Sequence, residues 1–90
     1  MTIVILDPRD NVATAAQALR PGAVASGPDV DVLVAQDVPR GHKIALEYIA
    51  EGAAVIRYGE VIGLAAAPIL RGEHVHVHNL VSRRLPGGRG

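Results

Sequence analysis

Apolar residues along this chain come mostly in short runs, and some of them alternate with polar residues at a period of two. Thr2 to Leu6 is a β-branched run that ends at Asp7-Pro8, and residues 30 to 34 read Val-Asp-Val-Leu-Val. Both patterns are typical of β-strands. We predict further short strands at residues 23–25, 43–49, 54–58, 61–67 and 73–80.

One stretch follows a helical period instead. Asp10 is a suitable N-cap, the residues at 12, 15, 16 and 19 are apolar, and Pro21-Gly22 supplies a stop signal. This pattern predicts a single helix near residues 10–20, with Asp10 and Asn11 explained as helix-cap residues.

A short unit with a central glycine recurs along the chain. It has the form apolar-x-x-Gly-x-x-apolar, and each copy predicts a tight turn in which glycine adopts a positive φ before a new strand. A separate hairpin corner is predicted at Tyr58-Gly59-Glu60. The three copies of the unit are Val38–Ile44, Ile49–Val55 and Ile69–Val75, centred on Gly41, Gly52 and Gly72.

Composition narrows the fold class. The apolar fraction is 49%, with two tyrosines and neither phenylalanine nor tryptophan, so a core must be built from β-branched and small side chains, which favours strands. Ninety residues allow one domain. We expect a mainly β domain over residues 1–80 and a flexible C-terminal tail over residues 81–90. A core this small is compatible with burial of the domain surface against a partner chain, which can be a second copy of the same chain in a homo-oligomer.

Charge and cysteine content exclude several function classes. Nine basic residues balance nine acidic ones, which argues against nucleic acid or an anionic membrane as a partner. The absence of cysteine excludes disulfides and thiol chemistry and suits a cytoplasmic protein. The apolar run at residues 2–6 is too short for a signal peptide or a membrane span.

The candidate chemistry lies in two segments, Gly41–Leu46 and Gly72–Asn79, which contain all four histidines. If the second segment is a strand, then His74, His76 and His78 share one face. Such histidines can converge on a metal ion, flank an anion or exchange protons. The alternative is a polar, solvent-facing side of an edge strand. One strand alone supplies too few ligands to specify a metal site.

Other polar residues are more ambiguous. Lys43 can hold a substrate carboxylate through charge-assisted hydrogen bonds, or it is simply a solvated lysine. Arg57 and Glu60 can pair across the hairpin corner. The sequence contains no Ser-His-Asp arrangement and no phosphate-binding glycine loop. The residues by themselves indicate a β-rich module with a histidine face, which is not a self-sufficient enzyme.

Four segments of the chain carry a recognisable family pattern: Asp10–Ala13, Gly41–Leu46, Val55–Gly63 and Gly72–Asn79. In their order and spacing they resemble the small SAF-type (β-clip) domain of the altronate and galactarate dehydratase family, over about residues 3 to 80. The last segment points to the altronate dehydratase branch or to the small subunit of sulfolactate sulfo-lyase. One departure is Asp7, at a position where the family often carries histidine.

The resemblance implies lyase chemistry on a hydroxy acid. A proton is removed beside a carboxylate and a β-substituent leaves, assisted by a divalent metal, iron or manganese, held mainly by a partner chain. The leaving group is hydroxide in the dehydratases, which gives a 2-keto-3-deoxy acid, and sulfite in the sulfo-lyase. The chain is then expected to be the small subunit of a sugar-acid dehydratase, inactive without a large catalytic subunit. The alternatives are the sulfo-lyase small subunit and a free-standing ligand-binding β-clip module.

The resemblance also suggests roles for individual residues. It places His76 and His78 at the subunit interface as catalytic groups, which act as metal ligands, proton carriers or donors to the substrate carboxylate. It places His42, Lys43 and Asn79 in contact with substrate. His74, the histidine nearest the glycine turn, is expected to be a bystander.

Overall fold

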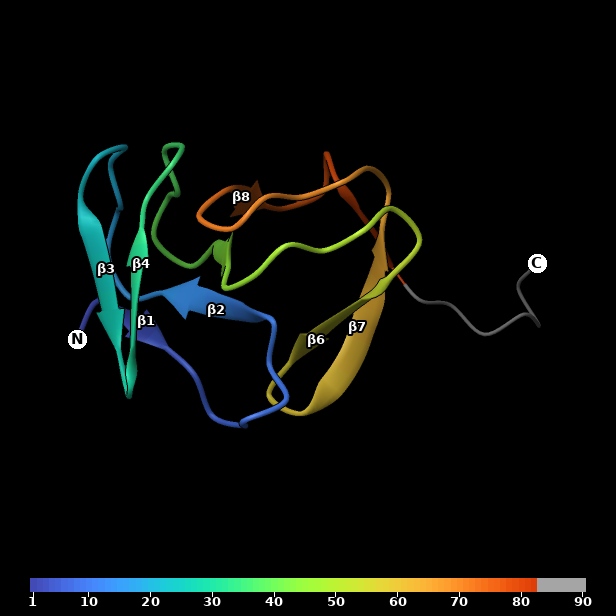
Figure 1. Cartoon of the computed structure of the whole chain (residues 1–90), viewed down its shortest axis with the longest axis horizontal. Coiled ribbons are helices and arrows are strands. Elements are labelled where there is room, and N and C mark those ends of the chain that lie inside the picture. Colours follow the sequence, from blue (N-terminus) through green and yellow to red (C-terminus); the bar gives the residue numbers. More distant parts are fainter. Residues whose placement is uncertain (83–90) are drawn as a thin grey trace.

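The computed structural model describes residues 1–82, and this part of the chain is built from nine strands without a helix (Figure 1). The predicted mainly β class is therefore confirmed. No segment of the described chain forms a helix long and apolar enough to cross a bilayer. The strands are β1 (Ile3–Val4), β2 (Val12–Ala15), β3 (Val24–Gly27), β4 (Val30–Leu33), β5 (Lys43–Ala45), β6 (Ala54–Arg57), β7 (Glu60–Ala65), β8 (His74–Val75) and β9 (Leu80–Ser82).

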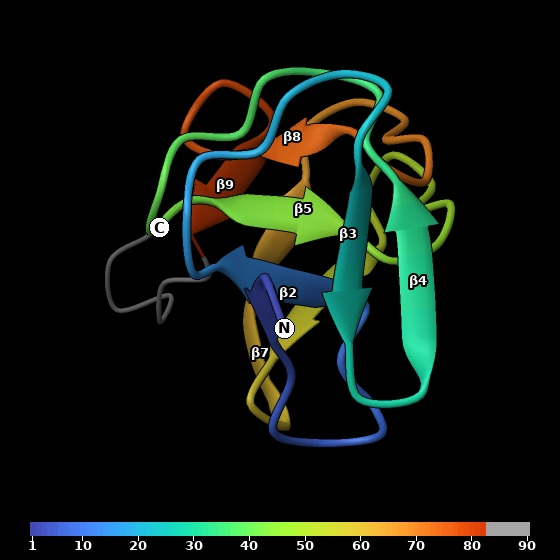
Figure 2. The same cartoon turned by 90° about the vertical axis from the view of Figure 1, so that its left-hand side faces the viewer.

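The strands form three antiparallel sheets. A central sheet has the order β1-β2-β5-β8, the β3–β4 hairpin lies on one side of it, and the β6-β7-β9 sheet lies on the other (Figures 1 and 2). Each face of the central sheet buries its own apolar cluster. Ala13 and Ile44 contribute to the cluster that includes the β3–β4 hairpin, whereas Val12 and Ala45 contribute to the one that includes β6 and β7.

The glycine turns are confirmed, and the structure adds a fourth copy of the unit at Leu19–Ala25. The glycines at 22, 41, 52 and 72 have φ values of 88°, 85°, 83° and 88°. These turns sit at equivalent places in two overlapping copies of one fold unit. The first copy consists of β1, β2, β3, β4 and β5, and the second consists of β2, β5, β6, β7 and β8. Each copy contains one hairpin and one isolated bridge, Leu19–Val38 in the first and Ile49–Ile69 in the second.

The two copies share their hydrogen bonds as well as their turns. The amide of Gly22 donates to Val34 O in the first copy, and the amide of Gly52 donates to Ala65 O in the second, both at 2.8 Å. Outside the turns, Thr2 Oγ1 accepts a hydrogen bond from the amide of Ser26 at 2.9 Å. Its counterpart is Asn11 Oδ1, which accepts from the amide of Ile56 at 2.7 Å.

The helix predicted near residues 10–20 is wrong, because this segment contains β2, a central strand. Val12 and Ala13 are both fully buried, one on each face of the sheet, so the strand shows no polar alternation. An apolar run buried on both faces cannot be told from a buried helix by periodicity. Asp10 and Asn11 do not cap a helix. Asp10 Oδ1 accepts from the amide of Gly59 at 2.8 Å, and the Asn11 side chain binds β6.

The continuous strand predicted over residues 73–80 is also wrong. β8 ends at Val75, residues 76–79 form a turn, and β9 joins a different sheet. The Asn79 side chain explains the break, because it donates to His74 O at 2.9 Å and accepts from the amide of His76 at 3.0 Å. β9 extends to Ser82, and the remainder of the expected tail, from residue 83, lies outside the described residues.

The hairpin corner at Tyr58-Gly59-Glu60 is confirmed. Tyr58 and Gly59 have φ values of 56° and 78°, and they connect β6 to β7. Two consecutive residues with positive φ suit the tight turn of a twisted hairpin. This corner projects Tyr58 and the end of β6 toward the central sheet, where the Tyr58 hydroxyl donates to Thr14 Oγ1 at 3.1 Å.

Candidate histidine site

The histidines gather where β5 and β8 run side by side. His42 follows the Gly41 turn and directly precedes β5, and His74 lies in β8, where it pairs with Ile44 of β5. His76 and His78 lie in the turn after β8. Histidines from distant parts of the sequence are thus brought together by strand pairing rather than by alternation along one strand. We call His42, His74 and His76 the histidine cluster.

The rings of the histidine cluster are stacked. The His42 and His76 centroids are 3.7 Å apart with the ring planes 10° from parallel. His74 lies at 5.1 Å from His42 and 5.7 Å from His76, again nearly parallel. His78 is exposed, and its ring is tilted by 38° at 5.0 Å from His74. His78 therefore borders the stack without joining it.

The ring nitrogens of the histidine cluster converge. His42 Nδ1 and His74 Nε2 are 2.8 Å apart, a hydrogen bond that needs one proton between the two rings. One possible ligand atom from each of His42, His74 and His76 lies within 4.8 Å of the others, and residues 1–82 contain no other such group of three or more. His74, expected to be a bystander, is thus hydrogen-bonded to His42 within the cluster.

Backbone contacts hold the cluster in place. The amide of His74 donates to Gln36 Oε1 at 2.9 Å, and Asn79 binds the turn on both sides of His76. Gln36 was not predicted from the sequence, because it lies 38 residues from His74 and belongs to no motif. Asn79 was predicted to bind substrate, and both polar atoms of its side chain bind backbone here.

The electrostatic setting favours neutral imidazoles. Burial lowers the pKa of His74 below its ordinary value of 6.5, and the neighbouring His78, His42, His76 and Lys43 lower it further. The pKa of His76 is lowered in the same direction by desolvation, His42, Lys43 and His78. Neutral rings keep a free lone pair, which both metal binding and proton abstraction require.

These shifts predict a pH-dependent stability for the metal-free chain. Because the folded pKa of His74 and His76 lies below the unfolded value of 6.5, the unfolded chain takes up protons first as pH falls. The thermal midpoint, measured with chelator present, should therefore decrease as pH is lowered through 6.5 toward about 5. The His74→Gln variant should show a shallower decrease. An equal slope in both proteins would contradict the prediction.

Lys43 lies next to the cluster but projects from the other face of the central sheet, as its neighbouring position to His42 predicts. It is half-buried and faces Thr14 of β2 and Val75 of β8 across the sheet. Burial lowers the pKa of Lys43, and the positive charge of Arg57 adds to the effect. Lys43 is therefore a partly desolvated cation close to the imidazoles.

Asp7, the departure from the family pattern, lies apart from the histidine cluster. Its carboxylate accepts hydrogen bonds from the side chain and the amide of Arg9, at 2.8–2.9 Å, and these lower its pKa to about 2. Asp7 is thus committed to a local ion pair beside the Gly59 corner.

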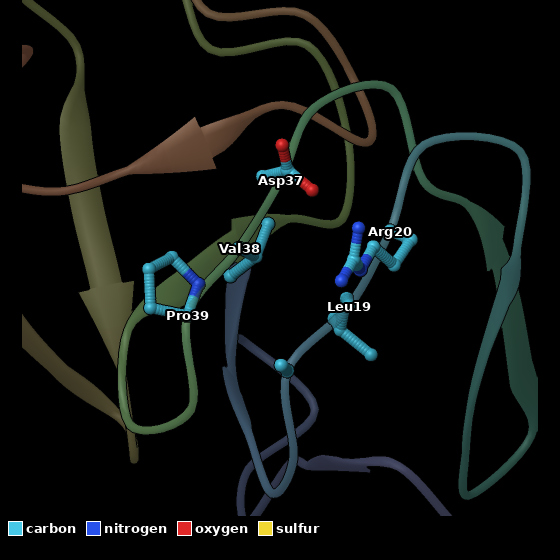
Figure 3. Close-up of a pocket in the computed structure, with 6 residues that line it drawn as sticks. Leu19, Arg20, Asp37, Val38 and Pro39 are labelled. Atoms are coloured by element: carbon cyan, nitrogen blue, oxygen red, sulfur yellow. The ribbon is translucent and has the colours of Figure 1, made fainter.

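A surface pocket of about 360 Å³ lies away from the histidines, at the bridge of the first copy (Figure 3). Leu19 and Arg20 line one side, and Val38 and Pro39 line the other. Backbone hydrogen bonds of 2.8 and 2.9 Å join Leu19 to Val38. The walls are largely apolar and hold no histidine, so the pocket offers no imidazole for acid–base chemistry.

Taken together, three sheets and a cluster of imidazoles at one end of paired strands define a small β domain that can present a metal- or proton-binding site. Its sequence matches the family model of the altronate/galactarate dehydratase SAF domain over residues 1–83. The chain belongs to this family, and the β-clip resemblance is confirmed.

Relatives of the chain include dehydratases and a sulfo-lyase subunit. Altronate dehydratase of Escherichia coli (strain K12) is 53% identical over 78% of this chain, and that of Bacillus subtilis (strain 168) is 42% identical over 79%. The chain spans only 14% of the length of each dehydratase. The (2R)-sulfolactate sulfo-lyase subunit alpha of Chromohalobacter salexigens is 47% identical over 52% of this chain and 50% of that protein.

Proposed function

We propose that this chain is the small subunit of a sugar-acid dehydratase, in which it presents its histidine cluster to the active site of a separate large catalytic chain. One observation carries the proposal: three imidazole nitrogens lie within 4.8 Å of one another in a member of the altronate/galactarate dehydratase SAF family. The likeness to a sulfo-lyase subunit alpha, a protein named as one subunit of an enzyme, supports an arrangement with a second chain.

The residues fit a divalent metal. Nitrogen ligands of one ion lie about 2.0–2.1 Å from it and so about 3 Å from each other, close to the 2.8 Å between His42 Nδ1 and His74 Nε2. An imidazole-rich set suits iron, whereas manganese prefers oxygen ligands, which the large chain would have to add. A bound metal would supply positive charge to the substrate's oxygens. His42 and His74 are the residues of this chain that would hold it, because the ring of His76 lies face to face with that of His42 and does not point its nitrogens at the same ion.

We assign proton transfer and substrate contacts to residues around the start of β5 and the turn after β8. We assign to His76, which is half-exposed and whose pKa is lowered, the role of accepting a proton from substrate. His78 extends from the same turn toward the large chain. His42 and Lys43 contact the substrate from either side of β5. Asn79 holds the turn and so fixes the His76 ring, with a substrate contact as its further expected role.

The small subunit of a sulfolactate-type sulfo-lyase is the second candidate. The observation that favours it is the likeness to a subunit alpha, of which this chain covers half the length. The higher identity over a longer segment favours the dehydratase. Both candidates share proton removal beside a carboxylate and differ in whether hydroxide or sulfite leaves.

Reconstitution tests the proposal. The purified chain should give no measurable dehydration of altronate, because it contains no more than one edge of an active site, and addition of the large chain from the same source should restore turnover. The assay follows 2-keto-3-deoxy acid and sulfite release across a panel of sugar acids and sulfolactate. Dehydration by the small chain alone would refute the two-chain proposal. Failure to co-purify with any lyase chain would favour a free-standing binding module.

A further inference from the structure

Two cations lie together near the histidine cluster without an acidic partner. Lys43 lies in β5 and Arg57 ends β6, and within residues 1–82 the only ion pair joins Arg9 to Asp7. Glu60 is the cross-strand partner of Arg57, but the two side chains do not pair. The Nε atom of Arg57 is buried and has no hydrogen-bond partner within residues 1–82. The described part of the chain therefore provides neither cation with a counter-charge.

Neighbouring side chains fix these two cations in place. The Arg57 guanidinium carbon lies 5.1 Å from the centre of the Tyr58 ring, a cation–π contact. The Tyr58 hydroxyl donates to Thr14 Oγ1 at 3.1 Å, and Thr14 faces Lys43 across the β2–β5 pair. This series of contacts runs from Arg57 through Tyr58 and Thr14 to Lys43, so the two cations lie on the same side of the β2–β5 pair.

Comparison of the two copies shows that the fold does not need these cations. The shared hydrogen-bond and strand registers make Ala13 equivalent to Lys43, and Gly27 equivalent to Arg57. Ala13 is fully buried in the apolar cluster of the first copy, and Gly27 packs against Ile3. The first copy therefore adopts the same backbone with two small residues at these positions, which favours a role in binding for the cationic pair of the second copy.

We propose that Lys43 and Arg57 form a binding site for the carboxylate of a hydroxy-acid substrate, with Arg57 as the specificity-determining residue that the sequence did not reveal. A guanidinium and an ammonium together provide several charge-assisted donors that match a carboxylate. Lys43 directly follows His42 and projects from the opposite face of the central sheet, so the acid would bind at the start of β5 on the face away from the histidine rings. The identity of the ligand as a hydroxy acid rests on the proposed function. The existence of a binding site at Lys43 and Arg57 does not depend on it.

The test measures binding to the full 90-residue chain by NMR, without the large subunit and with chelator present. The probes are altronate, altritol as the uncharged polyol of the same carbon skeleton, (2R)-sulfolactate and sulfate. We expect altronate or sulfolactate to shift the backbone amides of Lys43, Arg57 and Tyr58 saturably, with a dissociation constant in the range of about 1–10 mM for a few charge-assisted hydrogen bonds. Altritol and sulfate should not produce these shifts at the same concentrations.

Variants of Arg57 distinguish the contribution of its positive charge to binding from that of its planar guanidinium group. Arg57→Gln should weaken binding of the acid by about 10-fold or more, equivalent to about 1.4 kcal/mol. Arg57→Lys, which keeps the charge but loses the planar fork, should fall between it and the unaltered chain. Arg20→Gln is the matched control, because Arg20 is an exposed arginine on the first copy, and it should bind normally. Unchanged histidine ring signals in Arg57→Gln would show that the fold and cluster persist.

Three results would overturn the inference. One is the absence of a saturable shift with either acid up to about 50 mM, well above a millimolar dissociation constant, which would indicate that Lys43 and Arg57 meet a carboxylate of a partner chain instead. The others are equal binding of altritol or sulfate, and unaltered binding of the acid by Arg57→Gln. Because the readout is binding to this chain alone, it is independent of lyase activity. Acid binding without turnover in the reconstituted complex would keep the site and reject the proposed function.

Discussion

Replacement of His76 by alanine should lower the turnover of the reconstituted two-chain complex by about 100-fold or more, the scale of a lost metal ligand or general base. His76 stacks on His42 at 3.7 Å and shares the converging nitrogens of the histidine cluster. Its side chain is half-exposed and its backbone amide, not its ring, makes the bond to Asn79. The thermal midpoint of the isolated chain should therefore change little.

Two further variants serve as comparisons for the effect of His76→Ala on turnover. His78→Ala should lower turnover by less than about 10-fold, because the exposed His78 ring lies outside the set of converging nitrogens. Gln17→Ala, at an exposed position in the turn after β2, should have no effect on rate or stability. Metal content of each complex is measured alongside the rate. If His76→Ala retains both full rate and full metal content, the cluster is only a polar surface.

Replacement of Gly72 by alanine should destabilise the isolated chain by about 3 kcal/mol or more, which is a large part of the stability of a small domain. Gly72 is buried with a φ of 88°, a conformation that costs a residue with a Cβ about 1–2 kcal/mol. A Cβ there would also collide with the carbonyl oxygen of Leu33. The measurement is unfolding in urea followed by circular dichroism.

Gly52→Ala is the control for Gly72→Ala. Gly52 occupies the equivalent place in another copy of the turn and has a φ of 83°, and a Cβ added to it would meet no other atom within 4 Å. Its replacement should cost only the backbone penalty of about 1–2 kcal/mol. Equal losses for the two variants would show that the contact between the Gly72 turn and β4 contributes nothing to stability.

The parts of the fold that follow local rules were predictable. Each turn glycine needs a positive φ whatever surrounds it, so Gly41, Gly52 and Gly72 were identified from a seven-residue pattern. The Tyr58-Gly59 corner belongs to the same class. The fourth copy of the turn, at Gly22, was missed because the helix predicted over residues 10–20 ended at Pro21-Gly22 and gave that glycine a different explanation.

The candidate site was predictable in its membership but not in its geometry. Both histidine segments carry recognisable family motifs, and all four histidines lie in them. Convergence of the His42 and His74 rings needs the β5–β8 register, and the place of His76 needs the turn that Asn79 stabilises. The Arg57 site depends on the β6 hairpin reaching the central sheet, which no single segment indicates.

The mainly β class, the positions of the glycine turns and membership of the SAF family follow from residues close together in the chain, so they can be predicted without a structure. The assignment of β2 as a strand and of His74 to the histidine cluster depends on contacts between distant residues. The reason is the same in both cases. Asp10 and Asn11 find their hydrogen-bond partners 49 and 45 residues away, and His42 finds His74 32 residues away. The local preference of a segment for helix or strand carries no information about partners so far away in the chain. In β2, burial on both faces of the central sheet outweighs the local pattern that predicts a helix.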